Sequence, residues 1–308
     1  MSASGSVCAV VVTYDYDYAL LAEMIASIHD VLPQIIIVDN NARPDEQAIK
    51  GMGERFSRCI FIVNRHNAGL AIALNQGIER ALNASHGWVL CFDQDSRPTP
   101  TMLNALLEAR VVVAPETTAA IGPRIHDEPG HRDLPFVQFT WYGVRRNVVD
   151  STDSRFFAAD FLITSGCLIS AHALRTVGLM EADLFVDNVD LEWCLRARAA
   201  GFRCLGLGAA VLNHQIGHGS RRLPGVARPI LMHGPRRQYF MMRNRIALYG
   251  RAYVPWQWKT GDLPRLVFKL VYFPLFVTPR WQNLTSMLAG IRDGVRALRA
   301  AGRIPRSV

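Results

Sequence analysis

The sequence predicts an α/β fold with a mostly parallel central sheet and helices on both faces. Short apolar runs rich in β-branched residues alternate with segments of helical periodicity, and the connections between them are short. Polar side chains also cluster directly after the apolar runs, where open α/β sheets bind their ligands. With 308 residues, of which 50% are hydrophobic, the chain can bury a sizeable core.

The predicted strands are continuous apolar runs, of the kind that a parallel sheet buries on both faces. They cover residues 7–13, 35–38, 59–63, 88–92, 118–121 and 161–170. Apolar residues at helical spacing predict the helices. These cover residues 18–29, 70–82, 101–111 and 190–200, with a short helix inside 42–58. Gly201 is placed to cap the last of them. Residues 123–158 are polar and irregular, which predicts a long loop or a small excursion from the fold.

The charge is distributed unevenly along the chain. Residues 221–308 hold 15 arginines and 2 lysines against 2 aspartates, a net charge of +15, which leaves −7 for the other 220 residues. We therefore expect an α/β domain over residues 1–220 and a basic, aromatic-rich helical region over 221–308. A basic surface attracts nucleic acid, anionic lipid or phosphorylated substrates, but the acidic body argues against nucleic acid as a partner.

The basic region has the composition of a membrane-surface segment. Aromatic and cationic residues alternate over 251–292, which suits the lipid headgroup layer, and Pro264, Pro274 and Pro279 are expected to interrupt any long helix. The alternative is a helical cap whose aromatic side chains pack on the rest of the chain. No apolar run is long enough to predict a membrane-spanning helix, and the N-terminus does not resemble a signal peptide.

The six cysteines show no CxxC spacing and sit mostly within apolar runs. This pattern favours small core residues in a reducing compartment over a disulfide framework or a zinc site. We therefore expect a cytoplasmic protein that attaches peripherally to the inner face of the cytoplasmic membrane.

Two acids, Asp93 and Asp95, follow a buried strand one residue apart in the stretch CFDQDSRP. They repel each other unless a cation compensates them, and oxygen ligands in this setting suit Mg²⁺ or Mn²⁺ bound to a diphosphate. The alternative is that Asp93 caps the next turn and Asp95 is solvated. The chain contains no GxxxxGK[ST], GxGxxG or GxSxG motif, so a P-loop, a dinucleotide fingerprint and a hydrolase elbow are excluded.

Four motifs in order resemble the GT-A glycosyltransferases of family 2. They are VVTY at 11–14, IIVDN at 36–40, NAGLAIALNQG at 67–77 and FDQDS at 92–96. Three further stretches are similar to the bacterial rhamnosyltransferases of that family. They are GPR at 122–124, SGC at 165–167 and FVDNVDLEWCLR at 185–196. The resemblance covers about residues 7–250 in its motifs, and it implies a GT-A fold.

The resemblance also implies roles for individual residues. Asp39 would hold the nucleotide base, and Asp93 the ribose or the metal. The metal, Mg²⁺ or Mn²⁺, would be held by Asp95 and Asp93, with His214 close to it and to the diphosphate. The further residues implied to line the donor site are Thr13, Tyr14, Asn67, Gly69 and Asn75. Arg237 would contact the diphosphate or an anionic acceptor, and the alternative is that it belongs to a solvated helix face. The donor implied is dTDP-L-rhamnose.

Inverting transfer requires a base for the acceptor hydroxyl, and the family places it in a Glu-Asp pair at a helix start. Aligned on Leu195 and Arg196, that Asp falls on Asp190, but Val189 takes the place of the Glu. Asp187 is the rival, and Glu192 is a third candidate that can instead orient a partner. The alternative for Asp187 and Asp190 is a helix cap that complements the helix dipole.

The function expected from the resemblance is inverting, metal-dependent transfer of L-rhamnose to a lipid-linked saccharide acceptor in surface polysaccharide (O-antigen) biosynthesis. A related expectation is a rhamnosyltransferase acting on a rhamnolipid. The incomplete Glu-Asp pair and the basic region leave a nucleotide-sugar-binding protein without turnover as the alternative of another class. A nucleic-acid-binding protein ranks third, because the positive charge is confined to one end of the chain.

Overall fold

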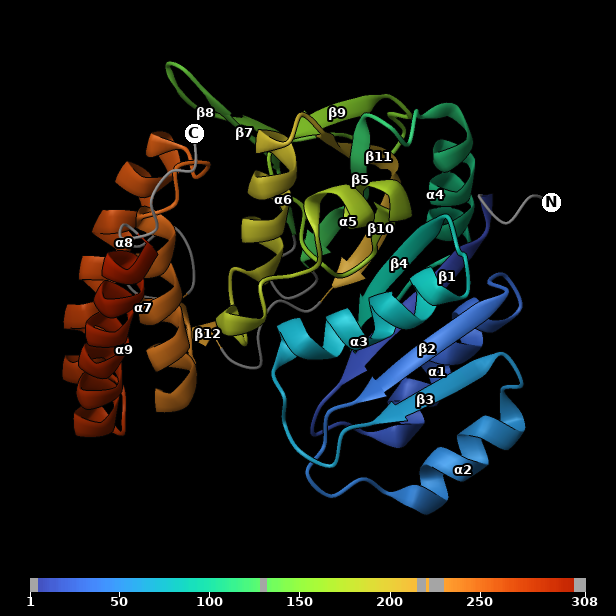
Figure 1. The fold of residues 1–308 in the computed structure, drawn as a ribbon, viewed down its shortest axis with the longest axis horizontal. Helices are drawn as coiled ribbons and strands as arrows, with labels where there is room; N and C mark the ends of the chain where they lie inside the picture. Colours follow the sequence, from blue (N-terminus) through green and yellow to red (C-terminus); the bar gives the residue numbers. More distant parts are fainter. Residues whose placement is uncertain (1–4, 128–131, 215–219, 222–229, 302–308) are drawn as a thin grey trace. The chain divides into compact units, whose positions relative to one another are not determined.

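A large sheet built from the apolar runs organises most of the chain (Figure 1). The computed structural model describes residues 5–127, 132–214, 220–221 and 230–301. In this part of the chain nine strands form one sheet in the order β3-β2-β1-β4-β10-β5-β11-β9, with β6 paired to β5. The strands are β1 (Val7–Thr13), β2 (Gln34–Asp39), β3 (Cys59–Val63), β4 (Trp88–Asp93), β5 (Thr118–Asp127), β6 (Arg132–Asp133), β9 (Phe156–Ala159), β10 (Cys167–Ser170) and β11 (Arg203–His214).

The predicted α/β class is confirmed. Strands β3, β2, β1 and β4 are parallel neighbours, and β5 is parallel to β11. Strand β10 runs antiparallel between β4 and β5, and β9 and β6 pair antiparallel with β11 and β5. The carboxyl ends of β1 to β4 therefore meet at one edge, which is where this fold presents a ligand site.

Helices cover both faces of this sheet. They are α1 (Tyr18–His29), α2 (Glu46–Arg55), α3 (Leu70–Asn83), α4 (Pro100–Val112), α5 (Ala171–Val177) and α6 (Val189–Ala199), with a 3₁₀ turn, η2, at Ala182–Leu184. Helices α3, α5 and α6 share one core with the strands, while α1 lies behind the sheet in Figure 1. A Cβ added at Gly77 would lie 2.4 Å from Val10 Cγ1, so α3 packs unusually close to β1.

The prediction of an irregular loop over residues 123–158 was wrong. Strand β5 continues to Asp127, and β7 (Phe136–Thr140) and β8 (Gly143–Asn147) form a hairpin. The strand signal is weak here because much of the hairpin is half-buried or exposed, so its strands lack the continuous apolar run of the central ones. The side chains at the tip of the hairpin, Trp141 and Tyr142, are 85% and 66% exposed.

The chain divides into two compact units. The sheet unit consists of Met1–Gln138, Arg145–Phe185 and Val189–Gln215, and the helical unit of Phe139–Val144, Val186–Asn188 and Ile216–Val308. The expected boundary after residue 220 lies close to the start of the long C-terminal segment of the helical unit. Two short stretches that the sequence assigned to the first domain, 139–144 and 186–188, group with this segment instead.

The described residues of the helical unit form three helices, α7 (Pro235–Tyr249), α8 (Trp256–Phe276) and α9 (Arg280–Ala301), and two short strands, β12 (Ser220–Arg221) and β13 (Ile230–Leu231). The expectation that prolines interrupt any long helix was wrong for α8, which runs through Pro264 and Pro274. Proline inside a helix costs about 3 kcal/mol. Burial of Leu266, Phe273 and other side chains against Met242 and Met287 offsets that cost.

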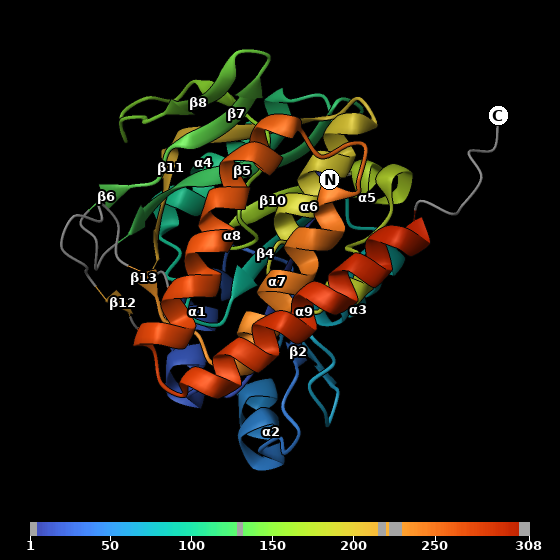
Figure 2. The same cartoon turned by 90° about the vertical axis from the view of Figure 1, so that its left-hand side faces the viewer.

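Helix α9 runs across α7 (Figure 2) at very short range. A Cβ added at Gly290 would lie 2.3 Å from Tyr239 O, and one added at Gly294 would lie 2.7 Å from Arg243 O. Helix α8 contacts α7 through side chains instead. Lys269 Nζ lies 4.0 Å from the sulfur of Met241, and the Tyr249 hydroxyl donates to Asp262 Oδ2 at 2.9 Å. No helix in the described part of the chain has a segment long and apolar enough to cross a membrane.

All six cysteines are free, and all but the half-buried Cys59 are buried. Burial raises the pKa of the Cys59 thiol to about 11 and that of Cys8 to about 12. Burial likewise raises the pKa of Cys91, with a smaller contribution from the negative charge of Asp93. These thiols are protonated core groups at neutral pH, as their positions in the apolar runs predict.

Candidate active site

The register of the parallel strands brings three predicted site residues to one edge of the sheet. Thr13, the last residue of β1, pairs with Asp39, the last residue of β2. On the other side of β1, Val12 pairs with Asp93, the last residue of β4. The sequence predicts this alignment because each residue directly follows its apolar run. Two carboxylates and a hydroxyl therefore converge from strands that are far apart in sequence.

Asp39 is fully buried, and its carboxylate is held in a fixed orientation. Its Oδ1 accepts from Asn41 N at 2.9 Å, and its Oδ2 accepts from the Tyr16 hydroxyl at 3.3 Å. Burial, with a smaller contribution from the Asp39 charge, raises the pKa of Tyr16, so this hydroxyl stays protonated and donates. Thr13 is also buried and donates to Val38 O at 3.4 Å, while Tyr14 is 48% exposed.

Gln94, between the two acids of the FDQDS motif, ties β4 to the loop after β1. Its Oε1 accepts from Tyr14 N at 2.6 Å, and its Nε2 donates to Tyr14 O at 3.1 Å. The side chain thus pairs with the backbone as a neighbouring strand would. Sequence reasoning missed this role, and the only signal was the position of Gln94 directly after a strand.

A network of side-chain amides fixes the loop after β3. Asn67 Oδ1 accepts from Gly69 N at 3.0 Å and from Asn40 Nδ2 at 3.2 Å. Asn64 and Gln76 form a reciprocal pair, in which Asn64 Nδ2 donates at 2.8 Å and Gln76 Nε2 at 2.9 Å. The sequence analysis included Asn67 but missed Asn40, Asn64 and Gln76. The network orders the backbone between β3 and α3, which the predicted donor site requires.

Gly69 precedes the first turn of α3 with a φ of +91°, which favours glycine. A Cβ at this position would lie 2.5 Å from the Phe185 ring, and Ala71 N donates to Phe185 O at 3.2 Å. Asn75, one turn further on, donates from Nδ2 to Met180 O and accepts from Met180 N, both at 2.9 Å. Gly69 and Asn75 therefore fasten α3 to the segment that leads into α6.

Asp93 and Asp95 differ in burial. Asp93 is half-buried and its backbone N donates to Ser96 Oγ at 3.1 Å, whereas Asp95 is exposed. Within the residues that the structure describes, no group of three or more His, Cys, Asp or Glu side chains is arranged to hold a metal ion. Mg²⁺ commonly binds through one or two carboxylates plus substrate phosphates and water, so these two acids fit a cation that arrives with a diphosphate. The side chain of His214, at the end of β11, lies outside the described residues.

The acids at the start of α6 have different environments. Asp190 is half-buried in the first turn. Its Oδ1 accepts from Leu191 N at 2.8 Å. Glu192 is fully buried and paired with Arg196, so it is already engaged within α6.

Asp187 belongs to the helical unit and is bound by Arg237 from α7. Arg237 donates from Nε to Asp187 Oδ2 at 3.0 Å and from Nη2 to Oδ1 at 2.9 Å. Asn244, also on α7, donates from Nδ2 to the carbonyl oxygens of Val186 and Asp187 at 2.7 and 2.9 Å. These bonds hold Asp187 and Asn188 at φ values of +65° and +62°. Asp187 and Arg237, both predicted site residues, are thus each other's partners.

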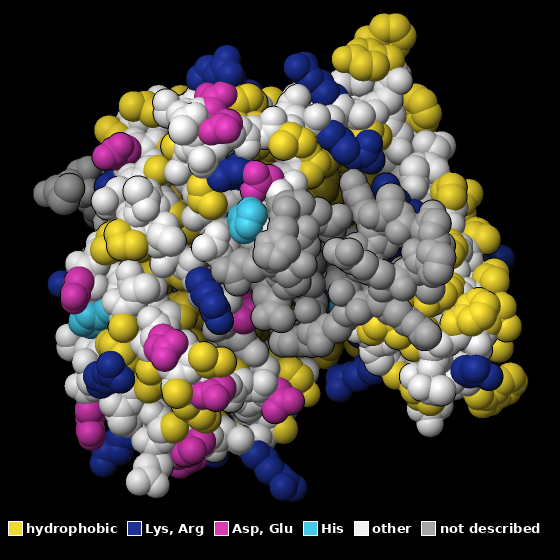
Figure 3. Space-filling model, turned by 180° about the vertical axis from the view of Figure 1, so that it is seen from behind, with side chains coloured by type: hydrophobic (Ala, Val, Ile, Leu, Met, Phe, Trp, Pro, Cys, Tyr) yellow, Lys and Arg dark blue, Asp and Glu magenta, His cyan; other side chains and the backbone are white. Residues whose placement is uncertain are grey.

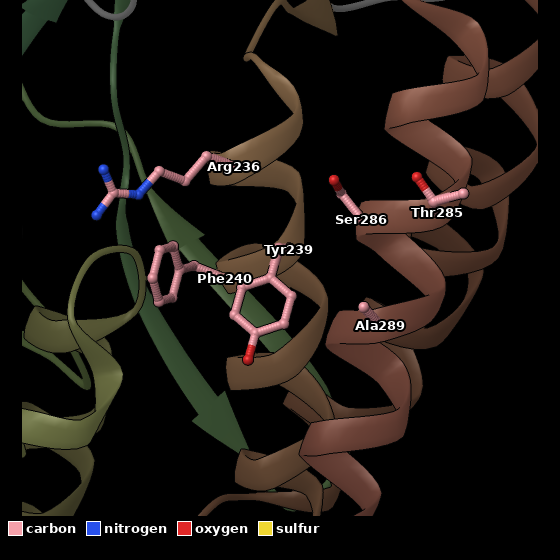
Figure 4. Close-up of a pocket in the computed structure, with 6 residues that line it drawn as sticks. All are labelled: Arg236, Tyr239, Phe240, Thr285, Ser286 and Ala289. Carbon is pink, nitrogen blue, oxygen red and sulfur yellow. The ribbon is translucent and has the colours of Figure 1, made fainter.

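The helical unit also contains a pocket of about 530 Å³ between α7 and α9 (Figure 4). Its lining residues are Arg236, Tyr239, Phe240, Thr285, Ser286 and Ala289. Ser286 and Ala289 face α7 from α9 in this view. Arg243 lies over the Phe240 ring at 4.8 Å, which keeps a positive charge close to the pocket.

Known proteins resemble this chain in sequence and in fold. Residues 8–177 match the family described as Glycosyl transferase family 2. Over 303 residues the chain is 26% identical to dTDP-rhamnosyl transferase RfbF of Shigella flexneri, covering 97% of this chain and 99% of that protein.

Two solved structures share the fold at low sequence identity. One is S. aureus TarS 1–349 in complex with UDP-GlcNAc (15% identity, TM-score 0.58, 95% of this chain and 81% of that chain). The other is GalNAc-T7 with UDP, GalNAc and Mn²⁺ (12% identity, TM-score 0.59, 97% of this chain and 58% of that chain).

Proposed function

The chain belongs to glycosyl transferase family 2 and is a glycosyltransferase, and we propose that it transfers L-rhamnose from dTDP-L-rhamnose to a lipid-linked saccharide. The reaction inverts the anomeric centre and serves the assembly of a surface polysaccharide such as O-antigen. The choice of donor rests on one observation: the similarity to a dTDP-rhamnosyl transferase extends over 97% of the chain. The acids and amides at the ends of β1 to β4 support nucleotide-diphosphate binding at that edge.

The nucleotide binds at the ends of β1, β2 and β3 in this proposal. The imide N–H of thymine is a donor, and the buried Asp39 carboxylate, held by Asn41 and Tyr16, is a rigid acceptor for it. Thr13 and Tyr14 line the same pocket, and Asn67 and Gly69 let the backbone approach the sugar nucleotide. Asn75 serves the site by fixing the position of α3.

Asp93 and Asp95 would hold Mg²⁺ or Mn²⁺, together with His214 by resemblance. When bound, such a cation offsets the negative charge that develops on the departing diphosphate. Asp93 is held at the strand end by β4 and Ser96, so it supplies a fixed oxygen, while the exposed Asp95 can turn towards its ligand.

Asp190 is the base in this mechanism. As the acceptor oxygen forms its bond to the anomeric carbon, the bond from that carbon to the diphosphate oxygen breaks and its electron pair leaves with dTDP. The acceptor proton passes to the Asp190 carboxylate. Asp190 is proposed by resemblance, since it aligns with the Asp of the family's Glu-Asp pair, whereas Asp187 is bound by Arg237 through both of its oxygens.

The pocket between α7 and α9 suits the saccharide of the acceptor. Tyr239 and Phe240 provide flat apolar faces for a sugar ring, and the Thr285 and Ser286 hydroxyls provide hydrogen-bonding groups for its substituents. Its volume of about 530 Å³ is in the ordinary range for small-ligand sites. Arg236 and Arg243 add positive charge, which favours an acceptor that carries phosphate.

We further propose that the helical unit attaches the enzyme to the inner face of the cytoplasmic membrane. One side of α8 exposes Leu263, Val267, Val271 and Leu275 at intervals of four residues, each at least 51% exposed. Trp141, Tyr142, Trp256 and Trp281 in the same unit are at least 60% exposed. Viewed from behind, hydrophobic side chains gather on this unit and on the hairpin, with Lys and Arg among them (Figure 3). Such a surface matches a headgroup layer.

The proposal is tested by calorimetric titration of the full chain with dTDP, UDP and GDP, each with and without Mg²⁺. We expect dTDP to bind at least about tenfold more tightly than UDP or GDP, and Mg²⁺ to strengthen its binding. Asp39→Asn should weaken dTDP binding, because the amide presents a donor where the base requires an acceptor. Preference for UDP or GDP would overturn the donor, and no binding of any nucleotide would overturn the proposed activity.

A further inference from the structure

One side chain joins the FDQDS motif to the backbone that follows β1. Gln94 Oε1 accepts from Tyr14 N at 2.6 Å, and Gln94 Nε2 donates to Tyr14 O at 3.1 Å. The ladder between β1 and β4 ends with the pair Val12 and Asp93, before it reaches either residue. The amide of Gln94 therefore links the two segments beyond the ends of their strands, and it engages both polar groups of the Tyr14 backbone.

The residue after Tyr14 is tethered from the β2 side, which is opposite β4 in the sheet. Asp15 N donates to Asn41 Oδ1 at 2.7 Å, in the segment that follows β2. Asp15 has a φ of +49°, which a residue with a side chain rarely adopts, so the backbone turns sharply after Tyr14. Because Tyr14 is 48% exposed, core packing holds its ring only in part. Hydrogen bonds to the backbone on both sides therefore set the direction of this ring.

The turn that carries Gln94 between the two acids has its own supports. Asp93 N donates to Ser96 Oγ at 3.1 Å, and Ser96 N donates to Asp93 O at 3.1 Å. Ser96 is buried, and its Oγ lies 2.6 Å from Ser165 Oγ, with which it shares a hydrogen bond. None of these contacts uses the Gln94 side chain. Removal of its amide should therefore release Tyr14 and leave the turn with the acids in place.

We infer that Gln94 is a positioning residue that holds Tyr14 in the wall of the base pocket, so that it strengthens binding of the nucleoside and not of the diphosphate. The inference rests on the proposed function, which assigns Tyr14 to that pocket. All the residues involved belong to the sheet unit. A ring that is already held in place loses less conformational freedom when a base binds against it, and such preorganisation strengthens binding.

The test is calorimetric titration of the full native chain and of Gln94→Leu with thymidine, dTDP and inorganic pyrophosphate. Leucine offers no polar group to the Tyr14 backbone. We expect Gln94→Leu to weaken thymidine and dTDP binding about tenfold each and to leave pyrophosphate binding within about twofold. The factor by which Mg²⁺ strengthens dTDP binding should be the same in both proteins, since both acids remain. Gln47→Leu, which removes an exposed amide on α2, is the control and should change none of these affinities.

A double-mutant cycle shows whether Gln94 acts through Tyr14. Tyr14→Ala should weaken thymidine binding by itself, and adding Gln94→Leu to it should have little further effect, because no ring is left to position. Thermal unfolding of each variant checks that it is folded. If the effects of the two substitutions on thymidine affinity are instead additive, Gln94 does not act through Tyr14 and the inference is wrong.

Two other results would also overturn the inference. Equal weakening of pyrophosphate and thymidine binding in Gln94→Leu would show that the amide supports the turn with the acids. Unchanged thymidine and dTDP affinity would show that it positions nothing that the nucleoside needs. The donor proposal is judged separately, by the preference of the native chain among dTDP, UDP and GDP. If the native chain prefers UDP, that proposal fails, and uridine and UDP take the place of thymidine and dTDP in this test.

Discussion

Glu192 and Arg196 form a buried ion pair within α6 in which Arg196 Nε lies 2.7 Å from Glu192 Oε1. The same guanidinium donates from Nη1 to Val177 O at 2.7 Å and from Nη2 to Leu179 O at 2.6 Å. Arg196 therefore links α6 to the end of α5. The carboxylate of Glu192 compensates the positive charge of the partly buried Arg196 guanidinium. We therefore expect Glu192 to position Arg196 and not to act as the base.

Glu192→Gln should lower the free energy of unfolding by about 3–5 kcal/mol, because it leaves the Arg196 charge partly buried without its counter-ion. The matched control is Glu54→Gln, which removes a pair at the same spacing with side chains 79% and 70% exposed and should cost less than about 0.5 kcal/mol. Urea unfolding measures both. A folded Glu192→Gln protein of native stability that has lost turnover would show that Glu192 acts in the reaction itself.

Asp190→Asn should lower kcat about a thousandfold, the order expected when a general base is removed, and leave the Kd for dTDP within about twofold. Asp187→Asn weakens the contact with Arg237 but leaves the proposed base in place, so its kcat should fall by less than about tenfold. Turnover and dTDP titration on both variants decide between the two acids. The reverse order of effects would move the base to Asp187, and unchanged function in both variants would favour a binding protein without turnover.

Gly69→Ala should destabilise the protein by several kcal/mol and weaken donor binding. The new methyl group would meet Phe185 at 2.5 Å, and the φ of +91° is strained for alanine. Gly53→Ala is the control: this glycine lies inside α2 with no atom within 4 Å of an added Cβ, so alanine should stabilise by about 0.5–1 kcal/mol. Thermal unfolding of the two variants should therefore shift in opposite directions, and a shift in the same direction would contradict the proposed contact.

Lys269→Met should raise the free energy of unfolding at pH 7 by up to about 3 kcal/mol, because the folded state of the native chain holds a poorly compensated charge. The pKa of Lys269 is lowered from 10.5 to about 8 in the folded state. Between these two values the unfolded chain binds more protons, so native stability rises with pH over this window. In urea unfolding, the difference in free energy of unfolding between Lys269→Met and the native chain should therefore shrink from pH 8 to pH 10.5. An advantage that does not change with pH would show that packing, and not charge, is its origin.

Replacing Leu263, Val267 and Val271 together by glutamine should reduce flotation with phosphatidylglycerol vesicles by about tenfold or more, because each side chain loses its apolar contact with the lipid. The control replaces Val111 and Val112, which are 71% and 74% exposed at the end of α4, and should leave flotation unchanged. Binding of the native chain should weaken in high salt, since lysines and arginines surround the apolar side chains. If the α8 variant floats with the vesicles as well as the Val111 and Val112 control does, the exposed face of α8 does not bind the membrane.

Most of the sheet unit could be predicted from sequence, because its strands are buried on both faces and appear as unbroken apolar runs. The polar residues at their ends, such as Asp39 and Asp93, could be placed for the same reason, since parallel register brings strand ends together. What escaped prediction depends on side chains that meet across the fold. The pairing of Asn64 with Gln76, and of Gln94 with the backbone of Tyr14, follows no periodicity in sequence.

The helical unit was harder to predict because tertiary packing overrides local preference there. Pro264 and Pro274 signal helix ends, yet α8 continues through both since its inner side is buried. The hairpin with Trp141 at its tip has weakly apolar strands and resembles a loop. Gln238 looks like an ordinary surface residue of a basic helix, and only its burial distinguishes it.

The burial and protonation of the cysteine thiols make it possible to measure local and global unfolding of this protein. Most of the thiols are shielded in the core, and those with a raised pKa are almost entirely protonated at neutral pH, so alkylating reagents should attack the native chain slowly. Local or global opening exposes thiols of ordinary reactivity in the sheet unit, while residues 221–308 contain none. A brief alkylation pulse followed by mass measurement would therefore count open molecules without an engineered probe, and it would monitor the sheet unit alone.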